Sequence, residues 1–533
     1  MDTKRGALVA AILGSAVVAV DATVVNVALP TIANDLGGGL AGQQWVANAY
    51  LLTLSSLILV SGSLSDLYGE RRVFTLGVAG FGLTSLLCAL APTVELLVVA
   101  RALQGVSGAL LTPASLAIIV AVFPASERGA AIGSWTAWGG MGYLVGPLIG
   151  GQIVDSVSWR FVFALNVPLV LVTLAMAARY VPQARERGDA RPKLDVTGAL
   201  LCALGLAGVS FGLIEQPVLG WSDPAVFVPL VGGVVVSAAF VVYELHTPAP
   251  MLPLELFRRR NFTVANIETL LMYGGMALQA FFLVLFLQQV AGFSALESGS
   301  ASLVPTLAMF LLSRRFGGLA DRYGPRWFMT VGPLMVAGGF LLMLRLDANT
   351  SYVRDLLPAL VLYSLGLAVT VSPLTATVLA DADERDAGIA SAVNNAIART
   401  SGLLATAAVG AVLAASYAAQ LDDAVAARPL SPAAEARLAA ARGRALSPVD
   451  VRGLPPEDRV VVARAVRDAG VKTFHLSAMI GAAMLASAGL LGGVLLRNPR
   501  RPTAARCCPG GQFVGAPEEA GQSGPSAEQP AHA

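Results

Sequence analysis

Apolar stretches long enough to cross a lipid bilayer recur along this chain of 533 residues, and they limit its fold more than any other feature. A helix needs about 20 mostly apolar residues to span the hydrocarbon core of a membrane. Such stretches lie near residues 8–29, 45–64, 73–91, 96–122, 130–154, 161–181, 196–215, 225–245, 263–290, 297–316, 327–346, 355–379, 389–416 and 474–496. The sequence therefore predicts an all-α integral membrane protein with about fourteen transmembrane helices.

The composition excludes several classes of protein. Charged residues make up 13% of the chain, against about 25% in a typical soluble domain, so a large soluble enzyme is excluded. The net charge of +2 does not favour binding to nucleic acid. None of the lysines (Lys4, Lys193 and Lys472) lies in a G-x-x-x-x-G-K-[ST] context, which argues against a nucleotide-hydrolysing P-loop.

The cysteines and histidines predict no catalytic or metal site. Cys88 and Cys202 lie within apolar stretches, and Cys507 and Cys508 are adjacent near the C-terminus, so they match neither a disulfide framework nor a zinc site. The three histidines are scattered along the chain at His246, His475 and His532. We therefore expect a protein that is not an enzyme and that holds no metal and no organic cofactor.

Arginine placement predicts the orientation of the helices, because short cytoplasmic loops are enriched in Lys and Arg. Arginines follow the even-numbered stretches, at Arg71, Arg72, Arg128, Arg258, Arg259, Arg260, Arg322, Arg326 and Arg385. The alternate short loops 31–44, 216–223 and 291–296 contain neither Lys nor Arg. Both termini are thus predicted to be cytoplasmic, in a multi-pass protein of a bacterial plasma membrane.

A duplicated sequence element divides the chain into halves. GSLSDLYGERR begins at Gly62 and GGLADRYGPR begins at Gly317, 255 residues further on. Both copies follow even-numbered stretches, so the halves run in the same direction, as in the parallel repeats of major facilitator transporters. A six-helix half needs only about 200 residues. We therefore predict six-helix halves at 1–181 and 251–496, with two added helices in 182–250 between them.

Two segments fall outside the predicted membrane helices. Residues 417–473 form an extracytoplasmic loop in this scheme, with an Ala- and Arg-rich stretch near 433–445 that favours helix. Residues 497–533 are rich in Gly, Pro, Ser and Glu, and this composition is typical of a disordered tail.

The chain resembles the fourteen-span drug:proton antiporters of the major facilitator superfamily over about residues 8–496. The motifs that carry the resemblance occur in order along the chain. DATVVNVALP begins at Asp21, GSLSDLYGERR at Gly62, RALQG at Arg101 and GYLVGPLIGG at Gly142. WRF begins at Trp159 and NVP at Asn166. The resemblance implies a major facilitator fold that exports hydrophobic or cationic organic compounds by alternating access. It also implies protons and a small organic substrate as partners, and a proton gradient in place of a cofactor.

The fifth stretch contains a glycine motif that favours close helix packing. Gly142, Gly146 and Gly150 are four apart and give one helix face room for a neighbouring backbone. Pro147 removes a backbone hydrogen bond and bends the helix, and Gly151 completes the motif. Ordinary packing is the alternative reading. By resemblance, this helix seals the two halves against each other and is associated with export.

The duplicated loop element is a candidate conformational latch. A carboxylate at a helix N-terminus is stabilised by the helix dipole, and arginines nearby can bridge to neighbouring helices. Topogenic positive charge with a glycine turn is the alternative. The candidate residues are Gly62, Asp66, Gly69, Arg71, Arg72, Gly317, Asp321, Arg322, Gly324 and Arg326.

Charges inside apolar stretches are the candidates for proton coupling, because ionisable groups in a membrane are costly and usually functional. Asp21 and Arg101 lie at similar predicted depths, and we expect them to pair. The alternatives are a static packing acid and an arginine that reaches outward to the interface. Glu268 and Arg399 form a second candidate, either an ion pair or a second proton site. The alternative places Glu268 at the lipid headgroups beside Arg258–Arg260.

The substrate cavity is only weakly specified. The polar and aromatic candidates for its lining are Asn26, Gln104, Trp135, Trp138, Gln279, Phe281, Phe282 and Asn395. Such a mixed lining suits bulky apolar molecules. A dedicated exporter of one endogenous metabolite, such as an antibiotic, siderophore or lipid, is the main alternative function, and a non-transporting sensor is another. We expect a monomer.

Overall fold

The computed structural model describes residues 2–182, 195–248, 250–380, 387–425, 430–442, 445–446 and 449–498. Residues 1–496 form one compact unit, and residues from Arg497 onward form a second. Of the tail predicted at 497–533, only Arg497 and Asn498 are among the described residues.

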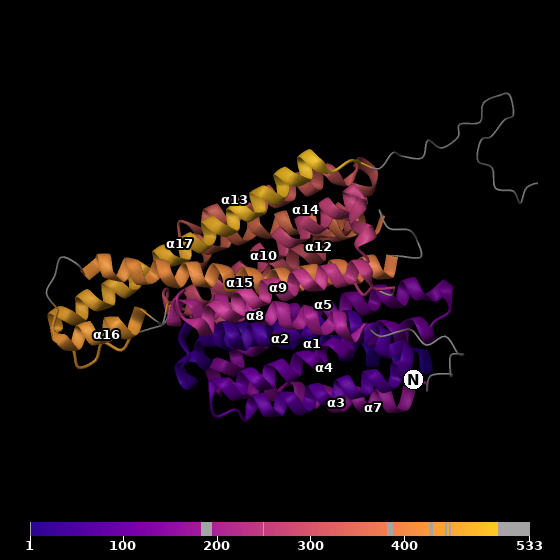
Figure 1. Ribbon diagram of the computed structural model, residues 1–533, viewed down its shortest axis with the longest axis horizontal. Helices are drawn as coiled ribbons and strands as arrows, with labels where there is room; N and C mark the ends of the chain where they lie inside the picture. Colours follow the sequence, from indigo (N-terminus) through magenta and orange to yellow (C-terminus); the bar gives the residue numbers. More distant parts are fainter. Residues whose placement is uncertain are drawn as a thin grey trace, which may run out of the picture. The chain divides into compact units, whose positions relative to one another are not determined.

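The described residues form helices and no strand (Figure 1). The first half contains α1 (Thr3–Leu36), α2 (Gly39–Tyr68), α3 (Glu70–Ala89), α4 (Val94–Val122), α5 (Ala125–Ser156), α6 (Arg160–Ala164) and α7 (Asn166–Tyr180). Then come α8 (Val196–Leu219), α9 (Pro224–His246) and the short η1 (Leu254–Arg258). The second half contains α10 (Arg260–Gln289), α11 (Ala295–Ser300), α12 (Leu303–Tyr323), α13 (Pro325–Met343), η2 (Tyr352–Leu356), α14 (Leu357–Ala380), α15 (Ala387–Val425), α16 (Pro432–Arg442) and α17 (Pro456–Leu495).

The predicted membrane-spanning stretches correspond to long apolar helices in the structure. Among the described residues, twelve helical segments are long and apolar enough to cross a bilayer. Two further helices, α2 with 30 residues and α5 with 32, occupy the second and fifth predicted stretches. The fold class is confirmed as an all-helical membrane protein, and the exact count of fourteen spans stays a prediction.

The duplicated element has the same backbone geometry in both halves. Gly69 separates α2 from α3 with φ of 89°, and Gly324 separates α12 from α13 with φ of 88°. Side chains other than glycine rarely adopt such angles, because Cβ then crowds the backbone. Each glycine N–H also closes the preceding helix, on Ser65 O and Ala320 O respectively. The conformation explains why glycine occurs at this place in both copies.

The two added helices, α8 and α9, pack against each other as a hairpin. The hairpin contacts α2 of the first half and α15 of the second, and Figure 1 shows it between the two halves. On this seam, Trp45 Nε1 of α2 donates a hydrogen bond of 2.7 Å to Glu215 Oε1 of α8. The hairpin therefore bridges the halves along their length.

The segment 417–473, predicted as a loop, is largely helical in the structure. Helix α15 continues to Val425 and α17 already begins at Pro456, so both extend beyond the predicted membrane stretches. Between them α16 occupies Pro432–Arg442, where the Ala- and Arg-rich stretch predicts helix. We call α16 and these two extensions the cap, because Leu421, Leu438 and Val462 pack into one apolar cluster. The cap lies at the end of the bundle away from the N-terminus (Figure 1).

We use two names for the ends of the bundle. The inner end is the end at which α1, α3, α5 and α10 begin, and the sequence predicts that it is cytoplasmic. The outer end is the opposite end, where the cap lies.

Candidate functional site

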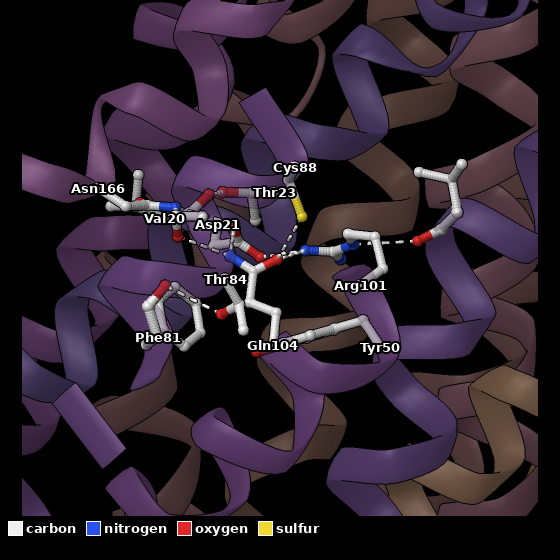
Figure 2. A network of polar contacts seen from close by, with 12 residues as sticks. Val20, Asp21, Thr23, Tyr50, Phe81, Thr84, Cys88, Arg101, Gln104 and Asn166 are labelled. Carbon is white, nitrogen blue, oxygen red and sulfur yellow. Dashed lines mark hydrogen bonds and ion pairs between the residues drawn. The ribbon is translucent and has the colours of Figure 1, made fainter. Parts of the chain in front are cut away.

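A buried ion pair lies inside the first half. Arg101 Nη1 of α4 is 2.6 Å from Asp21 Oδ2 of α1, and both residues are only 2% exposed. Figure 2 shows the two side chains pointing toward each other among the helices. The structure thus brings together the two residues that we expect to pair. It also shows that the arginine is enclosed rather than reaching to the surface.

Neutral polar side chains complete the coordination of the carboxylate. Gln104 Nε2, one turn after Arg101 on α4, donates to Asp21 Oδ1 at 3.0 Å. Asn166 Nδ2, at the start of α7, donates to the same oxygen at 2.9 Å. Ser85 Oγ of α3 accepts hydrogen bonds from both amides. Helices α4 and α7 therefore meet at the carboxylate of α1, with donors on both of its oxygens, and α3 joins the network through Ser85.

The guanidinium of Arg101 is also held on its other sides. Its Nε donates to Val46 O of α2 at 3.0 Å, and its Nη1 donates to Gln104 Oε1 at 2.7 Å. The charged group lies 4.3 Å from the centre of the Tyr50 ring and 5.9 Å from that of Phe163. Cations are attracted to aromatic faces at such distances. The ion pair is therefore a fixed element that joins α1, α2 and α4.

Two members of this network differ from the sequence prediction. Gln104 is predicted to line the substrate cavity, but the structure places it fully buried and engaged with Asp21 and Arg101. Asn166 is part of a matched motif but is not among the predicted site residues. The signal that would have found it is its place at the outer start of the sixth stretch, at a depth comparable with that of Asp21.

The predicted pair of Glu268 and Arg399 does not form. Glu268 of α10 is 0% exposed, and within the described part of the chain neither of its carboxylate oxygens has a hydrogen-bond partner. Arg399 lies half-buried on α15, with no ion pair to Glu268. The alternative location at the lipid headgroups is wrong as well, since the Glu268 side chain is fully enclosed.

The arginines of the candidate latch bind within their own halves. Arg71 Nη2 of α3 donates to Ala178 O of α7 at 2.8 Å. Its counterpart Arg326 of α13 donates through Nε to Gly493 O of α17 at 2.7 Å. In each half, a carbonyl near the end of the last helix thus accepts a hydrogen bond from this arginine.

The other latch residues contribute less to these contacts. Arg72 is exposed, and the Arg322 guanidinium lies 5.5 Å from the centre of the Tyr323 ring. Gly317 faces Ser372 of α14, where an added Cβ would lie 2.6 Å from Ser372 Oγ. The side chains of Asp66 and Asp321 and the surroundings of Gly62 lie outside the described residues.

The glycine motif of α5 packs directly against α1. A Cβ at Gly142 would lie 2.9 Å from Ala19 Cβ, a Cβ at Gly146 would overlap Thr23 Oγ1, and a Cβ at Gly150 would lie 2.9 Å from Val24 Cγ1. These α1 residues flank Asp21 on both sides. The flat glycine face therefore lets α5 approach the helix that holds the buried carboxylate.

An adjacent face of the same helix contacts the second half. A Cβ at Gly151 would lie 2.5 Å from Leu296 Cα of α11, and a Cβ at Gly299 of α11 would lie 2.5 Å from Pro147 O. Further on, both Asp155 oxygens accept N–H bonds from α11, at 3.0 Å from Ala295 and 2.8 Å from Leu296. Helix α5 is thus clamped between α1 and α11 near the outer end.

Two other contacts join the halves at the outer end. Gln288 Nε2 of α10 donates to Val27 O of α1 at 2.9 Å. Thr406 Oγ1 of α15 donates to Asn48 Oδ1 of α2 at 3.1 Å. Together with the α5–α11 contacts, these bonds form an outer seam between the halves. Sequence reasoning did not find Asn48 or Thr406, because polar groups on single helices do not reveal their partners.

The remaining predicted cavity residues do not converge on one site. Trp135 Nε1 donates to Ser15 Oγ of α1 at 2.8 Å, and Trp138 is 60% exposed. Phe281 and Phe282 are buried in an apolar cluster, which corrects their assignment to a cavity. The others are Asn26 and Gln279, which are half-buried, and Asn395, which is exposed and donates to Ser391 O.

A cavity of about 740 Å³ lies at the cap instead, between the start of α17 and the loop after α13. Its charged lining consists of Asp347, Arg459, Arg464, Arg467, Asp468 and Lys472. None of the predicted substrate residues lines this cavity.

Comparison with known proteins identifies the fold and the family. The family model of the Major Facilitator Superfamily matches residues 11–406. The chain belongs to the major facilitator superfamily. A tetracenomycin C resistance and export protein of Streptomyces glaucescens is 34% identical over 76% of this chain and 75% of its own length. A puromycin resistance protein of Streptomyces alboniger is 36% identical over 78% of this chain and 83% of its own.

Further relatives and structures agree with this family. A multidrug resistance protein of Mycobacterium tuberculosis is 33% identical over 79% of this chain and 78% of its own length. Among solved structures, an inward-facing bacterial homologue of the human lysosomal transporter Spinster aligns with a TM-score of 0.64, covering 92% of this chain and 97% of its own at 16% identity. A D-xylose–proton symporter aligns with a TM-score of 0.59 at 12% identity, covering 92% of this chain and 98% of its own. These structures support the fold alone.

This major facilitator protein is therefore a multi-pass membrane transporter of small molecules and not an enzyme. The superfamily moves solutes by alternating access, in which two repeated halves rock around a site near the middle of the membrane.

Proposed function

We propose that this transporter exports hydrophobic or cationic organic compounds, such as antibiotics, in exchange for protons. The buried pair of Asp21 and Arg101 is the single observation that carries the proton coupling. Support for efflux comes from the relatives, whose names describe resistance to or export of antibiotics. The proton gradient replaces a cofactor as the energy source, and one charge that crosses 100 mV releases about 2.3 kcal/mol.

The coupling follows from the chemistry of the pair. A proton on Asp21 removes the negative charge that Arg101 faces at 2.6 Å. Breaking a buried ion pair by neutralising one partner costs about 3–5 kcal/mol, because the other charge is left uncompensated. That cost favours a rearrangement of α1 and α4 in which Arg101 finds new partners. Protonation of Asp21 is thereby coupled to a change in the packing of α1 and α4.

The glycine motif connects this change to the outer seam. Gly142, Gly146 and Gly150 of α5 rest on α1 beside Asp21, while Gly151 and Asp155 of the same helix contact α11. A shift of α1 after protonation is passed to α5 and weakens its contacts with the second half. Protons that arrive from outside would in this way open the outer seam and release the exported compound.

Proteoliposomes test this proposal. An imposed proton gradient should drive accumulation of a lipophilic cation such as ethidium, a protonophore should abolish it, and Asp21→Asn should abolish the proton-driven component. Asp35→Asn is the matched control, because Asp35 pairs with Arg160 at a half-exposed site. Transport by Asp21→Asn at the wild-type rate, still sensitive to the protonophore, would refute the coupling role.

A dedicated exporter of one endogenous metabolite is the second candidate. The names of two relatives, which specify tetracenomycin C and puromycin, favour it. Deletion of the gene should then sensitise cells to one compound class, whereas a multidrug exporter would give a broad change in resistance. We further propose a monomer in the plasma membrane with both termini in the cytoplasm, as the arginine distribution predicts.

A further inference from the structure

Glu268 is a carboxyl group for which the coupling mechanism has no use. It lies on α10, it is 0% exposed, and both of its oxygens lack a hydrogen-bond partner among the described residues. An ionised carboxylate without a partner is very costly in such surroundings, and a buried acid therefore takes up a proton instead. The position of Glu268 implies a neutral carboxylic acid when α10, α13 and α17 are packed as they are here.

Three helices enclose this carboxyl group. At Gly492 of α17, an added Cβ would lie 2.9 Å from Glu268 Oε2 and 2.7 Å from Met329 O of α13. Met329 is 0% exposed and belongs to an apolar cluster that includes Leu374 and Val378 of α14. The absence of a side chain at Gly492 thus lets α17 close directly over the Glu268 carboxyl.

The internal repeat allows the surroundings of Glu268 to be compared with those of Asp21. Asp21 on α1 faces α3, α4 and α7, and Glu268 on α10 faces α13 and α17, which are the counterparts of α3 and α7. The stretch that corresponds to Arg101 and its neighbours is 360–366 on α14, and it contains no basic residue. Each half therefore directs a buried acid toward corresponding helices, although at different depths, and among the described residues only Asp21 is paired with a cation.

Two arginines control the helix end that covers Glu268. Arg326 Nε of α13 donates to Gly493 O at 2.7 Å, and Arg260 Nε of α10 donates to Leu495 O at 2.8 Å. The other titratable groups on the three helices within the membrane stretch are Tyr273 on α10 and His475 toward the outer end of α17. Arg260 and Arg326 thus hold the end of α17 at the inner end.

We propose that Glu268 is a second proton-binding site of this transporter, kept closed by the inner end of α17. When Arg260 and Arg326 release the α17 carbonyls, the O–H bond of Glu268 breaks and its proton passes to water at the inner end. Glu268 regains a proton that has entered from the outer side before α17 closes fully over it, so that one proton is carried inward. The inference rests on the proposed proton coupling, and it assigns one more proton to each transport cycle.

Infrared spectroscopy of the full-length protein in lipid films tests the protonation directly. At neutral pH, the wild type should show a carbonyl-stretch band of a protonated carboxylic acid that Glu268→Gln lacks and Asp21→Asn retains. If Glu268→Gln does not fold, Glu268→Asp should shift the same band. A wild-type spectrum that keeps the whole band in Glu268→Gln would overturn the proposal. This readout is independent of whether the protein transports anything.

Deuterium exchange of that band tests the closing role of α17. Arg326→Ala should speed the isotope shift of the Glu268 band at least several-fold. Arg345→Ala, an exposed arginine beyond the other end of α13, should leave it unchanged. Equal exchange rates in the wild type and Arg326→Ala would contradict control by this contact.

Proton-to-substrate ratios in proteoliposomes test the role in transport. Glu268→Gln should move fewer protons per exported molecule than the wild type, by about one, while Glu268→Asp should restore the ratio. An unchanged ratio would mean that the buried acid is only structural and would overturn the second site. Absence of compound-dependent proton flux in the wild type would refute the proposed function itself, and the infrared band would still report on Glu268.

Discussion

Each half of this transporter buries an acid within its helices, Asp21 in the first half and Glu268 in the second, and the two surroundings treat its charge in opposite ways. In the first half, Asp21 meets the guanidinium of Arg101 and the amides of Gln104 and Asn166. In the second half, Glu268 lies beside Gly492 of α17, without a donor among the described residues. The first acid is stabilised as an anion, whereas the second is stabilised as a neutral group.

This difference shows how two halves with the same fold can respond differently to protonation. If both halves held the same charged pair, protonation would loosen them equally, and no half would lead the movement. Here a proton on Asp21 breaks an ion pair, while a proton on Glu268 completes a neutral packing. The same chemical event therefore destabilises the packing of one half and stabilises that of the other.

The largest effect should come from removal of the fixed cation. Arg101→Ala leaves the Asp21 carboxylate buried with only amide donors, and we expect a loss of about 3–5 kcal/mol in the free energy of unfolding together with loss of transport. Arg160→Ala is the control, since Arg160 pairs with Asp35 at a half-exposed site, where about 0–1 kcal/mol is expected. Denaturation in detergent micelles measures both, and equal losses would contradict the central place of the buried pair.

A smaller effect should follow when α5 is forced away from α1. In Gly146→Ala the new methyl group overlaps Thr23 Oγ1, and overpacking of this kind costs about 1–3 kcal/mol. Gly133→Ala on the same helix meets nothing within 4 Å and should leave stability and transport near wild type. Transport assays that find the two variants alike would show that the glycine face does not link α5 to the acid of the first half.

A weaker perturbation concerns the outer seam between the halves. Asp155→Asn removes the negative charge that accepts two N–H bonds from the start of α11. Charge–dipole contacts of this type contribute about 0.3–1 kcal/mol. The population open to the outside should therefore rise a few-fold, as measured by spin-label distances between α5 and α11. Unchanged distance distributions would place the seal elsewhere along the seam.

The smallest effect on stability should come from the acid of the second half. Glu268→Gln has nearly the shape of the protonated acid and breaks no contact among the described residues, so we expect a change within about 0.5 kcal/mol. Asp21→Asn, the same change of chemistry in the other half, should cost several times more because it leaves Arg101 unpaired. Thermal unfolding of the two variants measures this difference, and equal losses of stability would contradict the contrast between the two acids.

Much of this fold follows from the sequence because its signals are periodic. Apolar stretches of bilayer length and the element repeated at Gly62 and Gly317 predict the helices and the two halves. The pair of Asp21 and Arg101 was predictable too, because both helices line the centre of the first half at the same depth. Of the cap, only the helix α16 was predictable, because the extensions of α15 and α17 beyond the membrane are charged and hard to distinguish from loops by composition.

The failed pair of Glu268 and Arg399 shows the limit of such reasoning. Depth along a helix follows from residue counting at 1.5 Å per residue, but the face that a residue presents depends on how its helix is rotated against its neighbours. Glu268 is directed to α13 and α17, and Arg399 lies on α15. Gln104 and Asn166 were misjudged or missed for a related reason, since an amide on a membrane helix gives no sign of its partner.

Proton release on substrate binding tests the central claim most directly. Purified wild-type protein in weakly buffered detergent solution should release protons when an exported compound is added, because compound and proton compete for the state in which Asp21 is ionised. Asp21→Asn should bind the compound without releasing a proton, and Asp35→Asn should behave as the wild type. Equal proton release by Asp21→Asn and the wild type would contradict the account.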